Sequence, residues 1–307
     1  ITTPPFWRLA LADNCKHFVG FCVWEGNKIP NYWLEYLLDE RVNLIFVPSY
    51  HTKQAILNTL KGEWINKEVF KTDDENTINI MSKIVVIPHG VDIDIFKPVE
   101  VKRDNKFTFI CNKGWRGNDW DRGGVQYLLK AFSEEFKKEE NVQLILKLNS
   151  SYINPNQVNQ AISNLNLNKD KAEIKIIIND IPYNKLNELY CLGDVFVCCT
   201  RAEAFDLGSA EAMACSLPII ASGYGGQIEH MNSENSLLFD YEMKEVKEDI
   251  QYEGISWCIP KIDNIRKKMR WCFENQDKVK EMGKNAKEFI SANFTWDYDS
   301  ADFDLDA

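Results

Sequence analysis

Two arginines six positions apart, Arg116 and Arg122, have the side chains and the spacing to bind an anion. They flank a polar loop that follows the apolar run 107–111 and ends in Gly123-Gly124, where a helix is predicted to begin. Guanidinium groups match the geometry of phosphate oxygens, and a helix N-terminus adds free backbone N–H groups and a partial positive charge. The pattern predicts a phosphate site; the alternative is an ordinary charged surface loop.

Two glutamates, Glu203 and Glu211, follow another predicted strand at residues 195–199. Glu203 lies in the loop that leaves the strand, and Glu211 lies near the first turn of a predicted helix at 207–215. Because the loop doubles back at residues 205–208, both carboxylates can face one crevice, and the amides of that turn can bind a second phosphate. The alternative is a capping carboxylate at Glu203 and a solvent-facing Glu211.

The elements that position these residues alternate between short apolar runs and amphipathic segments, which is typical of parallel α/β units. Before a charged linker at 92–106, the pattern predicts strands at 17–24, 42–47 and 83–87, helices at 31–39 and 49–60, and a polar loop at 61–79. Ser49 is the predicted cap of the second helix. After the linker, it predicts strands at 107–111, 142–148, 173–178, 195–199 and 218–221, and helices at 124–135, 156–164, 183–191, 207–215, 262–274 and 276–289.

The two series of elements predict two domains, at residues 1–98 and 99–307. The second series is long enough for a complete doubly wound domain, whereas the first has half the roughly six strands of a whole Rossmann-like domain. We therefore expect the first domain to be incomplete and, as no initiator Met is present, the chain to begin inside a longer protein. Ligands bind at the carboxyl ends of parallel strands, so the predicted site lies in the loops after residues 87, 111, 178, 199 and 221.

The composition is that of a globular protein with an acidic balance. The 307 residues are 45% hydrophobic and 27% charged, and the net charge is −10. An acidic chain is a poor generic binder of nucleic acid or anionic lipid, and no apolar run approaches the roughly 18 residues of a membrane-spanning helix. Nine cysteines without a CxxC pair predict buried free thiols in a reducing cytoplasm, and four scattered histidines predict no zinc site.

Taken together, the motifs resemble those of the retaining GT-B glycosyltransferases of family 4, the glycosyl transferases group 1. The resemblance runs from about residue 17 to 298 and rests on motifs in the family's order. They are Trp24-Glu25, Pro30, Trp33 and residues 47–49; residues 86–92 with Phe96 and Pro98; Arg116 and Arg122; Glu203 and Glu211 with Ala212-Met213-Ala214; and residues 218–222 with Gly225-Gly226 and Glu229.

The resemblance implies an α/β GT-B fold, with two Rossmann-like domains facing a cleft, and transfer of a sugar from a nucleoside diphosphate with retention of anomeric configuration. Arg116 and Arg122 would stabilise the leaving diphosphate, Glu203 would lie near the reacting centre, and Glu211 would bind the ribose. Further donor contacts are implied for Gly90, for the turn Phe205, Asp206, Leu207 and Gly208, and for the nucleobase loop Asn179, Asp180 and Ile181. The resemblance implies no metal and no cofactor besides the donor, a glycan, lipid-linked glycan or small molecule as acceptor, polysaccharide biosynthesis, and a cytoplasmic enzyme.

The sequence departs from the family's pattern in three ways, of which the largest is the absent first half of the first domain, a region that would hold much of the acceptor site. Asp206 and Ser216 stand where members often have Gly, and residues 21–25 hold no His where members often have one facing the donor sugar. We therefore assign no catalytic His.

Three other functions are compatible with the sequence. Four Asp-x-Asp motifs, beginning at Asp92, Asp119, Asp297 and Asp304, are the pattern of a metal-dependent transferase, although an acidic composition also produces them. A sugar phosphorylase or a nucleotide-sugar epimerase would use the same architecture. A truncated module that binds a nucleotide sugar without transferring it is the third.

Overall fold

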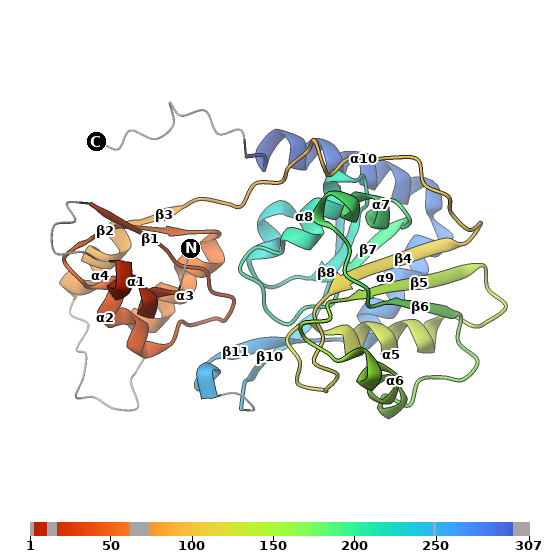
Figure 1. Ribbon diagram of the computed structural model, residues 1–307, viewed down its shortest axis with the longest axis horizontal. Helices are drawn as coiled ribbons and strands as arrows, with labels where there is room; N and C mark the ends of the chain where they lie inside the picture. The colour runs from red at the N-terminus through yellow and green to blue at the C-terminus, as the bar shows by residue number, and fades with distance from the viewer. Residues whose placement is uncertain (1–2, 11–16, 62–73, 248–249, 297–307) are drawn as a thin grey trace.

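The computed structural model describes residues 3–10, 17–61, 74–247 and 250–296, which form two α/β units (Figure 1). The first unit is built on a three-stranded parallel sheet in the order β1-β2-β3. Its strands are β1 Phe18–Phe21, β2 Val42–Val47 and β3 Ile84–Val86. Its helices are η1 Pro4–Phe6, α1 Trp7–Ala10, η2 Asn31–Trp33, α2 Leu34–Leu37, α3 Tyr50–Lys61 and α4 Asp74–Ser82.

The core of the first unit lies between this sheet and its helices. Buried side chains from the strands, such as Ile45, pack with Ile56 of α3 and with the indole rings of Trp24 and Trp33. The predicted cap of α3 is confirmed, because the backbone N–H of Thr52 donates to Ser49 Oγ at 3.1 Å. The predicted loop at 61–79 is wrong in its described part, where α4 begins at residue 74; residues 62–73 lie outside the described residues.

The second unit is a doubly wound domain around a six-stranded parallel sheet in the order β6-β5-β4-β7-β8-β9. The strands are β4 Phe107–Lys113, β5 Val142–Leu148, β6 Glu173–Ile177, β7 Val195–Cys198, β8 Ile219–Ser222 and β9 Ser236–Phe239. The helices are α5 Val125–Glu135, α6 Pro155–Asn164, η3 Tyr183–Lys185, α7 Leu186–Tyr190, α8 Leu207–Ala214, η4 Gly226–His230, α9 Ile262–Glu274 and α10 Gln276–Asn293.

Helices cover both faces of this sheet because consecutive strand residues point to opposite sides. Phe109 of β4 packs in the core under α5, α6 and α9, whereas the next residue, Ile110, packs in the core under α7, α8 and α10. From β4 the chain proceeds through β5 and β6 in one direction, and from β7 through β8 and β9 in the other. The strand order therefore reverses between β4 and β7, where ligands bind in such sheets.

A β-hairpin that the hydrophobic pattern did not reveal connects the two units. It consists of β10 Tyr241–Glu245 and β11 Ser256–Pro260, paired antiparallel, with the short helix η5 Ile250–Tyr252 between them. The hairpin extends from the second unit toward the first (Figure 1). Neither it nor β9 was predicted, and in the hairpin β10 is polar and largely exposed.

The predicted linker 92–106 has no helix or strand. Before it, Val91 donates its backbone N–H to the Phe294 carbonyl at 2.8 Å, and Val91 and Phe96 lie in the core of the second unit. The boundary at 98/99 stays a prediction. Among the described residues, no helix combines the length and apolar character required to cross a membrane.

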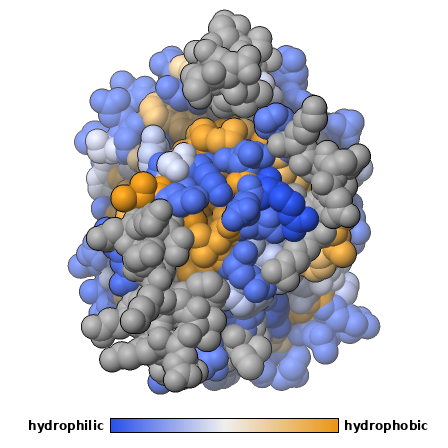
Figure 2. All heavy atoms as spheres, turned by 90° about the vertical axis from the view of Figure 1, so that its left-hand side faces the viewer, coloured by the Kyte–Doolittle hydropathy of each residue, from blue (hydrophilic) through white to orange (hydrophobic). Residues whose placement is uncertain are grey.

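The outer face of the first unit has hydrophobic atoms across its middle, between hydrophilic side chains (Figure 2). The strand at this end of the sheet order, β1, is an edge strand. Val19 on β1 is 44% exposed, and Phe6 and Leu9 of the N-terminal segment are exposed as well.

Candidate active site

The candidate site lies at the carboxyl ends of β4 and β7, where the strand order reverses. Glycines bring the surrounding loops into backbone contact. A Cβ on Gly124, whose φ is +72°, would lie 1.8 Å from the Cys199 carbonyl oxygen, and a Cβ on Gly226 would lie 1.8 Å from the Ala204 carbonyl oxygen. Side chains at both positions are excluded, so the two Gly-Gly pairs fix the loop that contains Glu203.

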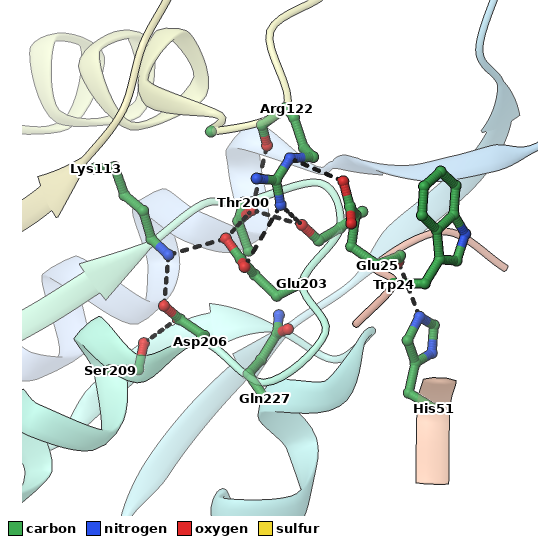
Figure 3. Close-up of polar contacts among 12 residues, drawn as sticks. Trp24, Glu25, His51, Lys113, Arg122, Thr200, Glu203, Asp206, Ser209 and Gln227 are labelled. Carbon is green, nitrogen blue, oxygen red and sulfur yellow. Dashed lines mark hydrogen bonds and ion pairs between the residues drawn. The ribbon is translucent and has the colours of Figure 1, made fainter. Parts of the chain in front are cut away.

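Within this loop cluster, two cations and two carboxylates alternate (Figure 3). Lys113 Nζ, at the end of β4, lies 2.5 Å from Asp206 Oδ1 and 3.0 Å from Glu203 Oε1. Arg122 Nη1 donates to the Ala202 carbonyl at 2.8 Å and lies 3.5 Å from Glu203 Oε2. Thr200 Oγ1 donates to Glu203 Oε1 at 3.0 Å. Glu203 is thus held between a lysine and an arginine from the loop after β4.

Burial opposes the charges of this cluster, and their mutual attraction preserves them. Burial alone would lower the pKa of Lys113, but Asp206 and Glu203 hold it well above its usual value. Burial alone would raise the pKa of Asp206, but the Lys113 ammonium and the Ser209 hydroxyl lower it to about 2. Burial likewise opposes the charge of Arg122, yet Glu203 and Glu25 raise its pKa. Lys113, Asp206 and Arg122 are therefore charged at neutral pH.

Glu211 lies in α8 and is only 8% exposed, which excludes the solvent-facing alternative. Tyr190 Oη donates to Glu211 Oε2 at 2.7 Å and accepts a hydrogen bond from Asn112 Nδ2 at 3.1 Å. Burial raises the pKa of Glu211 to about 7. Gly208, one turn earlier, has no atom within 3.7 Å of an added Cβ, so the N-terminus of α8 is not closed by tight packing there.

Arg116 and Arg122 line the same small cavity, of about 170 Å³. Arg116 is exposed, and its guanidinium lies 5.8 Å from the centre of the Trp120 ring. Its backbone N–H donates to Asp121 Oδ2 at 3.0 Å. The other lining residues are Lys113, Gly114, Trp120, Asp121, Gly123, Tyr152, Glu203, Tyr252 and Trp257. The cavity is therefore cationic, aromatic and open to Glu203.

The other residues predicted to contact the donor lie in the turn before α8 and differ in how far they are buried. Phe205 is buried, with its ring centre 5.4 Å from that of His89 and 4.9 Å from that of His230, so its side chain belongs to the core and only its backbone remains for a ligand. Leu207 is 40% exposed. Asp206, at φ +68°, precedes the first residue of α8 and directs its carboxylate to Lys113.

The remaining residues that were predicted to bind the donor make their described contacts outside this charge cluster. Gly90 packs against the chain after α10, where a Cβ would lie 2.7 Å from Thr295 and Trp296. Asn179 and Asp180 are exposed, and Asp180 Oδ1 accepts a hydrogen bond from Ser150 Oγ at 3.0 Å. Ile181 lines a separate cavity of about 630 Å³ beside the linker. Their roles stay predictions.

Sequence reasoning missed Lys113, Glu25, Tyr252 and Trp257 as site residues. Lys113 had a usable signal, because it is the last residue of the strand that precedes the loop with Arg116 and Arg122. Glu25 belongs to the first unit, and its Oε1 lies 3.5 Å from Arg122 Nε. Tyr252 and Trp257 belong to the unpredicted hairpin, and both line the cavity. Among the described residues, no group of His, Cys, Asp or Glu side chains is arranged to hold a metal ion.

Comparisons with known proteins agree with this architecture. Residues 114–252 match the model of the family described as glycosyl transferases group 1. Among curated proteins, D-inositol 3-phosphate glycosyltransferase from Segniliparus rotundus is 22% identical over 249 residues, which cover 69% of this chain and 54% of that protein. The matched part thus spans about half the length of this relative.

Solved structures confirm the α/β fold class. Sucrose-phosphate synthase from Thermosynechococcus elongatus has a TM-score of 0.65 at 19% identity, covering 94% of this chain and 66% of that one. A glycosyltransferase from Rickettsia africae has a TM-score of 0.61 at 21% identity, with coverages of 90% and 66%. HepE from Anabaena, in complex with UDP and glucose, has a TM-score of 0.60 at 17% identity, with coverages of 90% and 67%. The chain is therefore similar to the glycosyl transferases group 1 over residues 114–252, and it has the GT-B fold of its structural neighbours.

Proposed function

We propose that this protein is a retaining glycosyltransferase of the family 4 type, which transfers a sugar from a nucleoside diphosphate to an acceptor hydroxyl. The observation that carries the proposal is the cluster of Lys113, Arg122 and Glu203 at the strand-order reversal, beside a cavity that Arg116 also lines. The match of residues 114–252 to the glycosyl transferases group 1 supports it.

In the proposed reaction, the bond between the anomeric carbon and the diphosphate oxygen breaks, the acceptor oxygen bonds to the same face of the sugar, and the acceptor hydroxyl's proton passes to the departing diphosphate. Negative charge accumulates on the departing diphosphate. Preorganised cations stabilise such charge without reorganisation, and one lost contact of this kind typically costs on the order of 10²–10³ in rate. Arg116, Arg122 and Lys113 supply the positive charge that stabilises the diphosphate. Glu203 binds sugar hydroxyls beside the reacting carbon.

The nucleoside part of the donor would extend past α8. Glu211 would accept hydrogen bonds from the ribose, the N-terminal amides of α8 would bind phosphate oxygens, and residues 179–181 would contact the base. Sugars linked to uridine diphosphate are the first donors to test, because HepE was solved with UDP and glucose. We propose further that transfer needs no metal or separate cofactor, that the acceptor is a glycan, lipid-linked glycan or small molecule, and that the enzyme works in the cytoplasm.

Calorimetric titration of the chain with UDP, GDP and ADP, and with their sugar conjugates, tests the donor site. Micromolar binding of one nucleotide without added metal is expected, and EDTA should not change it. If none binds, the donor assignment is wrong. If a nucleotide sugar binds but is neither transferred to any acceptor nor hydrolysed, the chain is a binding module.

Two substitutions separate the proposed roles. Glu211→Ala should weaken nucleotide binding, because the ribose loses its acceptor. Arg116→Ala should mainly lower turnover, because its charge acts on the leaving group. Identical kinetics for both variants and the unaltered chain would overturn these roles.

A further inference from the structure

Glu25, a residue of the first unit, reaches the charge cluster of the second (Figure 3). It lies in the loop between β1 and η2, far in sequence from the residues it meets. Its Oε1 accepts a hydrogen bond from Tyr252 Oη at 2.6 Å and lies 3.5 Å from Arg122 Nε. The Glu25 side chain is 15% exposed, so this carboxylate is enclosed between the two units.

Side chains of helix α3 donate hydrogen bonds to several backbone carbonyls of the loop that contains Glu25. Thr52 Oγ1 donates to the Trp24 carbonyl at 2.8 Å, and His51 Nε2 donates to the Glu25 carbonyl at 2.9 Å. Asn58 Nδ2 donates to the Asn27 carbonyl at 2.9 Å. A side chain on a backbone supported in this way is preorganised, unlike an ordinary surface glutamate.

The hairpin holds the same loop from the side of the second unit. The Ser256 backbone N–H donates to Asn27 Oδ1 at 2.7 Å, and the ring of Tyr252 stacks on Trp24 with a centroid separation of 5.1 Å. Ile255, at 2% exposure, packs in the core of the first unit. The position of Glu25 relative to Arg122 is therefore fixed from both units.

The guanidinium of Arg122 is held on two sides. Nη1 donates to the Ala202 carbonyl and faces Glu203, and Nε faces Glu25. Among the described residues, the hydrogen bond and the ion pairs of the Arg122 guanidinium use Nη1 and Nε and leave Nη2 available, and Arg122 lines the cavity. Because a guanidinium is planar with donors in fixed directions, holding Nε and Nη1 also fixes the direction of the free Nη2 donors.

We propose that Glu25 is a positioning residue of the donor site, which holds Arg122 so that its Nη2 donors meet the diphosphate. The inference rests on the proposed function and adds to it a residue from the other unit. Donor binding by Arg122 is then complete only when the first unit is docked, because Glu25 and its supports α3 and Tyr252 come together at that interface.

Calorimetric titration of the full chain with UDP measures this role. Glu25→Ala should weaken UDP binding about tenfold, the lower end of what losing a supporting partner costs at metal sites. Glu25→Gln should recover most of the loss, since its amide oxygen still accepts from Tyr252 and Arg122. Asn27→Ala is the matched control, because it breaks a contact of the same loop with the same hairpin without touching Arg122.

A double-mutant cycle separates positioning from a general structural effect. In an Arg122→Gln background, Glu25→Ala should cause no further loss of UDP affinity. Equal losses for Glu25→Ala and Asn27→Ala would show that Glu25 acts only in docking and would overturn the inference. Unchanged or tighter UDP binding by Glu25→Ala would also overturn it, because Glu25 would then be neutral or a competing anion. If the unaltered chain binds no nucleoside diphosphate, the proposed function itself fails, and this inference with it.

Discussion

Lys113 is a buried cation that contacts two carboxylates. Its side chain is 11% exposed, its ammonium contacts Glu203 and Asp206, and the Asp206 side chain is 1% exposed. Removing one partner from a buried ion pair leaves an uncompensated charge, which costs more than the intact pair contributes. The site therefore depends on Lys113 for its integrity as well as for its chemistry.

Lys113→Ala should lower the free energy of unfolding by about 3 kcal/mol, because the Asp206 carboxylate remains buried without its cation. Urea denaturation at pH 7 measures the change. Lys106→Ala is the control, since it breaks an exposed 2.8 Å pair with Glu173 and should cost less than about 1 kcal/mol. If both variants lose a similar amount of unfolding free energy, burial does not make the Lys113 ion pairs more important for stability than an exposed pair.

Glu211 predicts a pH dependence of stability with a definite sign. Its pKa in the folded chain is raised from 4.5 to about 7 by burial. Between these values the unfolded chain releases the proton and the folded chain retains it, so stability falls as pH rises across this window and levels off above it. The loss is about 3 kcal/mol at 1.36 kcal/mol per pKa unit.

Glu211→Gln removes that titration and keeps an acceptor for Tyr190. The difference in unfolding free energy between the variant and the unaltered chain should therefore grow in favour of the variant from pH 5 to pH 8. Urea denaturation at these two pH values measures it. A difference that does not change with pH would mean that Glu211 ionises normally in the folded chain.

At the scale of elements, two glycines with the same backbone conformation differ in what surrounds them. Gly124 and Gly254 both have φ +72°. A Cβ on Gly124 would lie 1.8 Å from the Cys199 carbonyl oxygen, whereas a Cβ on Gly254 would meet nothing within 4 Å. At position 124, glycine therefore permits both the left-handed backbone conformation and the close contact between the loops after β4 and β7.

Gly124→Ala should destabilise the chain by at least about 3 kcal/mol, because displaced backbone adds to the left-handed strain. Gly254→Ala should cost only the strain, about 1–2 kcal/mol. Thermal or urea denaturation of both variants measures this. If they are equally destabilised, the loops can separate without cost.

At the scale of the whole molecule, the hairpin and helix η4 of the second unit both contact the first unit. Ile255 of the hairpin is inserted in the core of the first unit, and Glu229 of η4 accepts a hydrogen bond from the backbone N–H of His51 at the start of α3, at 3.3 Å. A carboxylate at a helix N-terminus is stabilised by the helix dipole. Docking of the units thus combines apolar burial with a charge at a helix end.

Ile255→Asp should separate the units, because a carboxylate cannot be buried in an apolar core without a partner. Small-angle X-ray scattering should show a larger radius of gyration than for the unaltered chain. Met243→Asp, on the exposed strand β10 of the same hairpin, should leave it unchanged, since Met243 is 44% exposed. An unchanged radius for Ile255→Asp would mean that other contacts suffice for docking.

The sequence by itself determined the elements whose signals are local. β2, β5 and α9 have the predicted bounds, because continuous apolar runs and helical periodicity are properties of neighbouring residues. The order of these elements, and the loops at their carboxyl ends, pointed to Arg122, Glu203 and Glu211. Tertiary structure alone decided the partners: Lys113 meets a carboxylate 90 residues away, and Glu25 meets Tyr252 across 227 residues. Strand β10 of the hairpin that brings Tyr252 there is polar and exposed, so its place depends on pairing with β11 and on the hairpin's contacts with the other unit.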